Sequence, residues 1–280
     1  MELRKRREHL PPGPSFAGRV VWIVGASSGI GAALARLFAA LGAQLVLSGR
    51  RRERLEEVCA QCGGEERCTV LPLDLDDFGK ARSAVENAAQ AFGGLDALVL
   101  AAGISQRAYA VDTEDEVLAR IMEVNFRTPA AIAHHAVSWL REREDPMIVA
   151  VSSIASTLLT PYRSSYAASK RALEGYFGVL RMELEREKIP IRVVMVTPGF
   201  VRTEISQSAM AGDGSPHGQM DSGQQHGISA ERCARKIVQG ILAGKEEIRV
   251  GFGFRGRLGL FLKSVAPRVL QRRLTHGSVY

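Results

Sequence analysis

The feature that most constrains the fold is a short apolar run that leads straight into a glycine-rich turn and a helical stretch. Residues 19–24 read RVVWIV, which is short and apolar enough for a strand buried on both faces. The turn GASSGIG at 25–31 follows, and an alanine- and leucine-rich stretch continues to Leu41. This order predicts a parallel sheet whose strands are joined by helices.

The glycine-rich turn is suited to binding phosphate. Glycines at a strand-to-helix junction let the backbone approach a pyrophosphate, and the helix N-terminus offers N–H groups and a partial positive charge. The spacing is GxxxGxG, which differs from the general GxGxxG fingerprint, and a tight turn without a ligand is the alternative interpretation. The expected contacts to a dinucleotide are Gly25, Ser27, Ser28, Gly29, Ile30 and Gly31.

A second pattern places Tyr166 thirteen residues after Ser153 and four residues before Lys170. On a helix, residues at i and i+4 share a face, with Cβ atoms roughly 5–6 Å apart. At an effective dielectric near ~20, the charge on Lys170 would stabilise a Tyr166 phenolate by about 3 kcal/mol, or roughly two pKa units. Such a phenol can act as a general acid or base, and Ser153 can hold a substrate oxygen. An ordinary amphipathic helix is the alternative interpretation.

Together the two patterns resemble the short-chain dehydrogenase/reductase family over residues 19–250. GASSGIG is similar to the family's cofactor loop. Further matches are the catalytic tetrad Asn125, Ser153, Tyr166 and Lys170, the adenine-side pair Asp74 and Leu75, and the PGxxxT segment with Pro198, Gly199 and Thr203. Within the family, LPLDLDD at 71–77 and ISQR at 104–107 look like the dehydrogenase/reductase member-seven group.

The sequence departs from the family pattern at two places. Val24 stands where a threonine usually precedes the loop, and LAAG at 100–103 replaces the usual Asn-Asn-Ala-Gly. The second change removes a polar brace between central strands, for which we expect a backbone or water substitute. Ala102 and Gly103 remain expected cofactor contacts.

The chain alternates strands and helices, which predicts one Rossmann-type, doubly wound parallel α/β sheet of about seven strands with helices on both faces. Strands are expected near 19–25, 44–49, 69–73, 96–101, 147–152, 191–197 and 247–251. Helices are expected near 29–41, 51–61, 77–92, 113–141, 164–187 and 229–243. The expected domains are a flexible basic and proline-rich arm (1–18), a catalytic domain (19–251) with a substrate lid (206–227), and a basic amphipathic tail (252–280).

The end of the second expected strand favours NADP(H). Residues 47–52 read LSGRRR and lack the carboxylate that NAD-preferring proteins use to hold the ribose 2′-hydroxyl. Arg50 and Arg51 offer guanidinium groups suited to a 2′-phosphate. The alternative is that these arginines belong to the solvated start of the next helix, as Arg52 and Arg54 do.

The resemblance implies an NADP(H)-dependent carbonyl reductase that interconverts a secondary alcohol and a ketone or aldehyde by hydride transfer. Tyr166 would exchange the proton and Ser153 would hold the substrate oxygen. Lys170 would acidify the tyrosine and bind the nicotinamide ribose, and Asn125 would hold a water that links Lys170 to solvent. The alternatives are a 3-oxoacyl thioester reductase and a non-catalytic NADP(H)-binding scaffold or sensor.

The expected lid contains five glycines and no lysine or arginine. Long loops in compact domains are usually functional or disordered. Leu159 and Phe200, with Leu158 and Tyr162 beside them, are expected to form apolar walls that suit a lipophilic small molecule, although core packing would also explain them.

The chain is basic, and its positive charge bears on which partners it could bind and where it could be located. The formal net charge is +7, and residues 252–274 carry six basic and no acidic residues among apolar ones, a pattern that suits peripheral contact with an anionic membrane. Packing on the lid or on a partner subunit is the alternative, and no nucleic-acid module is recognisable. The resemblance implies a homo-oligomer, a dimer or tetramer, paired through helices near 113–141 and 164–187.

The remaining motifs are interpreted as structural. Cys59-x-x-Cys62 has no paired second motif, and His134-His135 has no companion ligands, so no metal site is expected. The chain contains no run of 18 apolar residues, and its start lacks the apolar stretch of a signal peptide. Together with four cysteines that suit a reducing compartment, this indicates a cytoplasmic protein.

Overall fold

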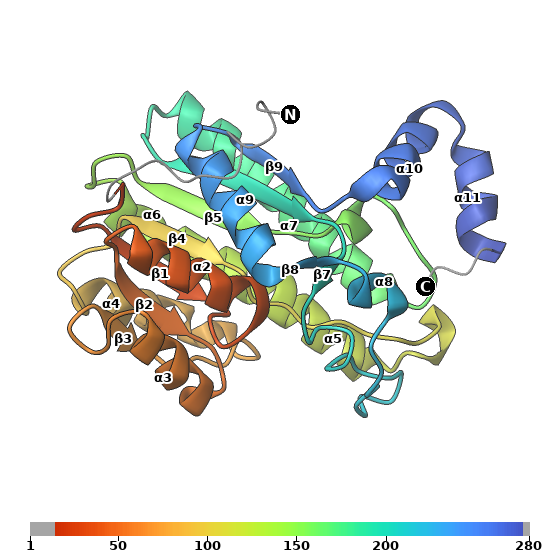
Figure 1. Ribbon diagram of the computed structural model, residues 1–280, viewed down its shortest axis with the longest axis horizontal. Coiled ribbons are helices and arrows are strands. Elements are labelled where there is room, and N and C mark those ends of the chain that lie inside the picture. The colour runs from red at the N-terminus through yellow and green to blue at the C-terminus, as the bar shows by residue number, and fades with distance from the viewer. Residues whose placement is uncertain (1–14, 277–280) are drawn as a thin grey trace, which may run out of the picture.

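A seven-stranded parallel sheet runs through the centre of the molecule, as the computed structural model shows for residues 15–276, the part of the chain that the structure describes (Figure 1). The strand order is β3-β2-β1-β4-β5-β6-β9. The strands are β1 (Val20–Val24), β2 (Gln44–Ser48), β3 (Cys68–Val70), β4 (Ala97–Leu100), β5 (Met147–Val151), β6 (Arg192–Pro198) and β9 (Glu247–Val250). The predicted doubly wound fold and its seven strands are confirmed.

Helices cover both faces of this sheet because its strands are apolar on both sides. Within β1, Val21 and Ile23 belong to the core under one layer of helices, whereas Trp22 belongs to the core under the other. The first layer contains α2 (Gly29–Ala40), α3 (Arg52–Gln61) and α9 (Ala230–Leu242); the second contains α4 (Ala81–Gln90), α6 (Thr128–Leu140) and α7 (Ser164–Arg186). Burial on both faces explains why the strands read as continuous apolar runs.

The topology creates a crevice at one edge of the sheet. From β1 the chain first builds outward through β2 and β3, and then returns to place β4 on the other side of β1. The loops that leave the carboxyl ends of β1 and β4 therefore diverge to opposite sides, and ligands of doubly wound proteins bind at such a switch point.

Close backbone packing fixes the turn between β1 and α2. A Cβ on Gly25 would lie 2.4 Å from the Ala102 backbone nitrogen, and one on Gly31 would lie 2.1 Å from the Gly25 carbonyl oxygen. Gly25 also has φ of +93°, a conformation that side chains with a Cβ disfavour. Gly25 and Gly31 are therefore required by the packing of β1, β4 and α2.

The expected helix at 113–141 is interrupted. It consists of α5 (Asp115–Met122), a π-helical turn η3 (Glu123–Arg127) and α6. The expected helix at 77–92 likewise begins as the 3₁₀ turn η1 (Phe78–Lys80) before α4. π turns often occur at functional sites, and this one contains Asn125.

The segments flanking the core contain more structure than the sequence suggested. Around the expected lid, β7 (Val201–Arg202) pairs with β8 (Ile228–Ser229), and a short helix α8 (Ser222–Gln225) precedes β8. The tail forms α10 (Gly253–Val265) and α11 (Pro267–His276), a helical pair that projects from one end of the molecule (Figure 1).

The structure differs from the expected arm of residues 1–18 at its end. Phe16 is 1% exposed, packs edge-on against Phe38 and donates its backbone N–H to Leu41. The arm's residues 1–14 and the last four residues of the expected tail, 277–280, lie outside the described part of the chain.

Two glycine substitutions distinguish a packing requirement from a simple helix preference. Gly31→Ala should unfold the protein or prevent its expression in soluble form, because the new Cβ would clash with the Gly25 carbonyl. Gly175→Ala, on α7 with open space around it, should instead raise the free energy of unfolding by about 0.5–1 kcal/mol. Urea unfolding measures both. Equal effects would contradict the packing account.

Candidate active site

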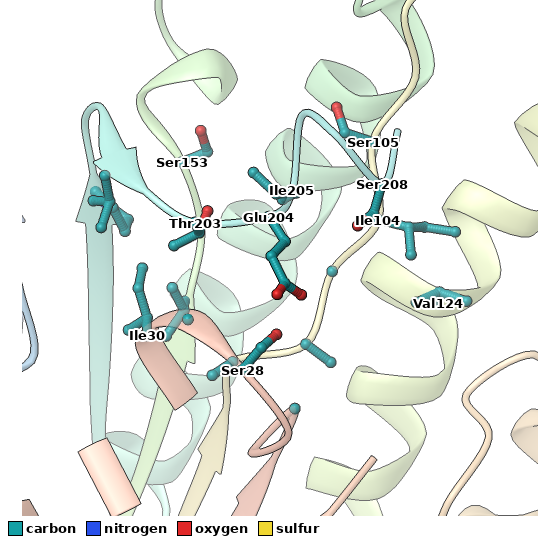
Figure 2. Close-up of a pocket in the computed structure, with 18 of the residues that line it drawn as sticks. Ser28, Ile30, Ile104, Ser105, Val124, Ser153, Thr203, Glu204, Ile205 and Ser208 are labelled. Atoms are coloured by element: carbon teal, nitrogen blue, oxygen red, sulfur yellow. The ribbon is translucent and has the colours of Figure 1, made fainter. Parts of the chain in front are cut away.

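A cavity of about 320 Å³ lies at the carboxyl ends of the strands, where the topology places the crevice (Figure 2). Its walls come from the segments that follow β1, β2, β3, β4, β5 and β6, and from α7. The expected site residues that line it are Gly25, Ser27, Ser28, Gly29, Ile30, Arg50, Arg51, Asp74, Leu75, Ala102, Gly103, Ser153, Tyr166, Lys170, Pro198, Gly199, Phe200 and Thr203.

The phosphate end of the cavity is the N-terminus of α2. Ser28 occupies the N-cap position without a side-chain cap hydrogen bond, and the first turn contains no acidic residue. The N–H groups of that turn are therefore left for a ligand, and the helix dipole favours an anion there. Gly29 has φ of +56°, and a Cβ on it would meet the Thr203 methyl group at 3.1 Å. This cradle fits the pyrophosphate of a dinucleotide.

The basic pair expected to bind a 2′-phosphate lies beside this cradle. Arg51 is the N-cap of α3, and its Nη2 donates to the Ser27 hydroxyl at 3.4 Å. Its Nη1 lies 3.1 Å from the carboxylate of Glu204, which Figure 2 shows directed toward Ser28. Glu204 was not predicted as a site residue, because nothing in the sequence indicates which residue after β6 reaches across the cavity.

The neighbouring arginines of α3 behave as the alternative interpretation expected. Arg52 pairs with Glu56 at 3.4 Å and Arg54 pairs with Glu57 at 3.1 Å, both on the exposed surface of the helix. Only Arg50 and Arg51 of this basic run line the cavity at the end of β2.

The reactive end of the cavity joins α7 to the end of β5. Tyr166 and Lys170 lie on the buried face of α7, with 7% and 3% of their surface exposed. The Lys170 Nζ donates to the carbonyl oxygen of Val151, the last residue of β5, at 3.0 Å. Ser153 follows two residues later and caps a 3₁₀ turn, η4 (Ile154–Ser156), by accepting from the Ala155 N–H at 3.2 Å.

The protonation of this pair differs from the sequence-based argument. Burial raises the pKa of Tyr166, while a hydrogen bond with Ser153 and the charges of Arg163 and Arg107 lower it. Burial also lowers the pKa of Lys170 to about 8, against a smaller opposing effect of Glu174. The spacing argument counted the charge on Lys170 but not the desolvation of both groups, which opposes ionisation of each.

Asn125 supports the site from behind the cavity wall. Its side chain accepts from the Ile104 N–H at 2.8 Å and donates to the Ile104 carbonyl at 2.9 Å. It also donates to the Ser169 hydroxyl at 2.9 Å, and Ser169 donates to the Tyr166 carbonyl. The π turn thus ties the segment after β4 to α7.

Three expected site residues do not line the cavity: Asn125, which lies behind its wall, Leu159 and Gly31. Leu159, predicted to be a substrate wall, is 62% exposed, because the chain has left the crevice by the end of η4. The substrate contact at Leu159 stays a prediction that this cavity does not support, whereas Phe200 does line the cavity. Gly31 is buried in the packing of α2 against the Gly25 carbonyl and serves the turn rather than the cavity surface.

A buried ionic cluster beside Tyr166 was missed by the sequence argument. Arg107, which follows β4, and Arg163, which precedes α7, both pair with Asp221 of the expected lid. The ISQR segment and an acidic residue in a lid without basic residues were the available signals. Neither indicates the pairing, which depends on how the lid folds back.

The cysteines behave as buried thiols. Cys59, Cys62, Cys68 and Cys233 are all free and buried, and burial raises the pKa of Cys62 to about 11 and of Cys233 to about 12. Thiols with raised pKa values are poor nucleophiles at neutral pH. Across residues 15–276, no group of three or more histidine, cysteine or acidic side chains is arranged to hold a metal ion.

Fold and site together define an α/β dinucleotide-binding oxidoreductase. A family model described as short chain dehydrogenase matches residues 19–214, and the chain belongs to this family. The chain is 36% identical over 261 residues to dehydrogenase/reductase SDR family member 7B of Bos taurus, which covers 90% of this chain and 79% of that protein. It is also 36% identical over 234 residues to SDR family member 7 of Homo sapiens, and the match covers 82% of this chain and 69% of that protein.

Solved structures show the same fold. A short chain dehydrogenase/reductase from Burkholderia phymatum in complex with NAD superposes with a TM-score of 0.80 at 21% identity, covering 95% of this chain and 99% of that one. A dehydrogenase/reductase from Sinorhizobium meliloti 1021 gives a TM-score of 0.72 at 27% identity, covering 85% and 95%. The similarity to SDR family members 7B and 7 confirms the predicted resemblance to the member-seven group.

The buried lysine should destabilise the fold at neutral pH. Because the folded-state pKa of Lys170, about 8, lies below its usual 10.5, the folded state bears the full cost of the buried charge below pH 8. Lys170→Met should therefore raise the free energy of unfolding at pH 7. The net gain should be about 2 kcal/mol once the lost hydrogen bond to Val151 is subtracted.

This gain in the free energy of unfolding should shrink as the pH rises from 8 toward 10.5, because Lys170 of the folded wild type loses its charge above a pH of about 8. Urea unfolding at pH 7 and pH 10 measures it, with Lys236→Met on the exposed face of α9 as the control. A pH-independent effect of Lys170→Met would contradict the assignment.

Proposed function

We propose that this chain is an NADP(H)-dependent oxidoreductase that interconverts a secondary alcohol and a ketone or aldehyde on a lipophilic small molecule. The observation that carries the proposal is the convergence of Ser153, Tyr166 and Lys170 with the N-terminus of α2 on one cavity. A scaffold that only bound a nucleotide would need the helix N-terminus but not a buried tyrosine and lysine.

The cofactor would be held along the whole cavity. The turn at 25–31 and Thr203 would hold the pyrophosphate, Arg50 and Arg51 the 2′-phosphate, and Asp74 with Leu75 the adenine side. Ala102, Gly103, Pro198 and Gly199 would contact the nicotinamide half. A nicotinamide cofactor supplies or accepts the hydride, and the remaining steps fall to side chains of this chain.

Those side chains exchange one proton with the substrate oxygen. Ser153 donates a hydrogen bond to that oxygen, and Tyr166 gives its proton in reduction and takes it back in oxidation. Lys170, protonated below a pKa of about 8, stabilises the phenolate from one helical turn away and is positioned to bind a ribose hydroxyl. Asn125 fixes α7 against the segment after β4, which keeps Tyr166 in place.

The expected substrate class rests on the apolar side chains near Ser153. Ile104, Ile154, Phe200 and Ile205 line this end of the cavity and suit an apolar substituent. A 3-oxoacyl thioester is the alternative substrate, and a panel of free ketones, aldehydes and acyl thioesters, followed by NADPH absorbance, separates the two.

Tyr166→Phe should lower kcat at least a thousandfold and leave the NADPH dissociation constant within about threefold, because only the proton-exchanging hydroxyl is lost. Tyr176→Phe, on the same helix but outside the cavity, is the matched control and should retain activity. Steady-state kinetics and fluorescence titration measure these effects. A Tyr166→Phe enzyme with most of its activity would contradict the assigned role.

NADPH should bind at least tenfold more tightly than NADH, because Arg50 and Arg51 face the ribose end and no carboxylate follows β2. Arg51→Gln should reduce this preference, whereas Arg52→Gln, which removes an arginine that does not line the cavity, should leave it unchanged. Fluorescence titrations give both dissociation constants. Equal affinities in the wild type would contradict NADP(H) specificity.

We infer a homo-oligomer assembled through α5 and α7, as expected. Leu118 on α5 and Val179 and Met182 on α7 are 42%, 54% and 69% exposed, although they are apolar. Exposed apolar side chains gathered on two packed helices are typical of a subunit interface. Size-exclusion chromatography with light scattering measures the oligomeric state.

We also infer that α10 and α11 contact an anionic membrane surface. None of the helices within residues 15–276 combines the length and apolarity needed to cross a bilayer. α10 rests on the body through Lys263, which donates to the Thr157 carbonyl at 2.7 Å. Phe254, Phe261, Val265 and Val269 are 50–79% exposed, among the basic residues Arg257, Lys263, Arg268, Arg272 and Arg273. The expected cytoplasmic location stays a prediction.

The combination of exposed apolar and basic groups should make binding to vesicles depend on both. The full chain should pellet with vesicles containing phosphatidylserine, less so at high salt, and little with phosphatidylcholine alone. Phe254→Ser with Phe261→Ser should reduce pelleting, and Val111→Ser, which alters an exposed apolar residue elsewhere, should not. Equal pelleting of all variants would exclude binding through α10.

A further inference from the structure

Three charged side chains form a buried cluster at the substrate end of the cavity. The side chains of Arg107, Arg163 and Asp221 are 6%, 10% and 7% exposed. Arg107 binds the carboxylate through two groups, its Nε at 3.2 Å from Oδ1 and its Nη2 on Oδ2. Arg163 Nη2 donates to the same Oδ2 at 2.7 Å. Asp221 thus bridges the two guanidinium groups.

The charges of this cluster do not balance. Two guanidinium groups share one carboxylate, which leaves a net charge of about +1 among largely desolvated groups. Buried charge of one sign acts strongly on its neighbours, because little water screens it. Arg107 and Arg163 both line the cavity that contains the Tyr166 hydroxyl, so the excess charge lies next to the group that would ionise.

The backbone holds both arginines rigidly with respect to Tyr166. Arg163 is three residues before Tyr166, and its carbonyl accepts from the Ala167 N–H at 2.8 Å in the first turn of α7. The segment that carries Arg107 is fixed to the same turn, because Gln106 Oε1 accepts from the Ser165 N–H at 3.0 Å. Arg107 also donates its backbone N–H to Met210 of the lid at 2.8 Å.

We propose that Arg107 and Arg163 are positioning residues that stabilise the Tyr166 phenolate, and that the lid carboxylate Asp221 sets how much of their charge Tyr166 experiences. The proposal rests on Tyr166 as the proton-exchanging group. With the lid closed, Asp221 neutralises part of the cluster and favours the protonated phenol. Removal of this carboxylate would leave the phenolate with both positive charges as neighbours.

The charged groups around Tyr166 support this assignment. Burial raises the pKa of Tyr166. The hydrogen bond with Ser153 and the charges of Arg163 and Arg107 oppose this effect and lower the pKa. Arg107 after β4, Arg163 before α7 and Lys170 on α7 line the cavity with Tyr166, as do Arg50, Arg51, Asp74 and Glu204 from the segments after β2, β3 and β6. Asp221 does not line the cavity and acts through its ion pairs with Arg107 and Arg163. Glu174 acts on Lys170 from the next turn of α7.

The test compares variants that change the cluster charge in opposite directions. Arg163→Gln removes a positive charge and should move the titration midpoint of Tyr166 to higher pH by about one unit. Asp221→Asn removes the negative charge and should move it to lower pH. Arg163→Lys should restore the wild-type midpoint, and Arg186→Gln, at the exposed end of α7, is the charge-matched control.

The midpoint is read in two independent ways. Carbon-13 NMR of tyrosine labelled at Cζ, assigned with Tyr166→Phe, follows the phenol without any turnover, and the pH profile of kcat/KM for alcohol oxidation follows it during turnover. Where Arg163→Gln does not fold, Arg107→Gln serves with the same expected sign. Midpoint shifts of opposite sign by NMR support the proposal even if the protein proves inactive.

Equal midpoints in all variants, shifts of the same sign for Arg163→Gln and Asp221→Asn, or a phenol that titrates in none of them would overturn the proposal. A purely structural cluster would lower activity in every variant but would not separate the midpoints by sign. Normal activity without midpoint shifts would leave the proposed function standing and reject this inference alone.

Discussion

The hydrogen bond between the Lys170 ammonium and the Val151 carbonyl holds the reactive end of the molecule together. It joins the middle of α7 to the last residue of β5, and so places Tyr166 opposite Ser153, two residues beyond the strand. A lysine buried to this degree is costly, which the lowered pKa of about 8 records. Active sites commonly contain such destabilising groups, because the geometry that a reaction needs is not the one that best stabilises the fold.

The cavity brings together two demands with different physical origins. At the α2 end, close backbone packing produces a turn that exposes N–H groups to an anion, and this packing explains Gly25 and Gly31. At the α7 end, burial makes every ionisation expensive, so the neighbouring charges decide which proton can leave. The Arg107–Asp221–Arg163 cluster is net positive, and its two arginines act on Tyr166 although Arg107 and Asp221 are distant from it in the sequence.

Much of the fold could be predicted from the sequence, as could the placement of the proposed reactive residues on one cavity. Continuous apolar strands and a glycine turn leave few alternatives to a doubly wound sheet, and the spacing of Tyr166 and Lys170 places them on one helical face. The details that failed depend on tertiary structure. The π turn around Asn125 follows from packing against α7, the Glu204–Arg51 contact from the path after β6, and the cluster at Asp221 from how the lid folds back.

The effect of Lys170 was overestimated for the same reason. A Coulomb estimate from helical spacing treats both groups as solvated at a fixed effective dielectric, whereas both are buried. Leu159 shows a second limit, since the sequence places this apolar residue near the site but does not show that its side chain is 62% exposed and outside the cavity lining. Sequence spacing shows which residues are neighbours on a helix or strand. It does not show how deeply a side chain is buried in the fold or in which direction it points.

The most direct test of the account is the fate of a labelled hydrogen during one turnover. The protein is incubated with NADPH carrying deuterium at the transferable position of nicotinamide C4 and with a panel of lipophilic ketones and aldehydes, and the products are analysed by mass spectrometry and NMR. The account predicts one deuterium on the carbinol carbon of the product and a solvent-derived proton on its oxygen. Tight NADPH binding with no carbon-bound deuterium in any product would contradict it.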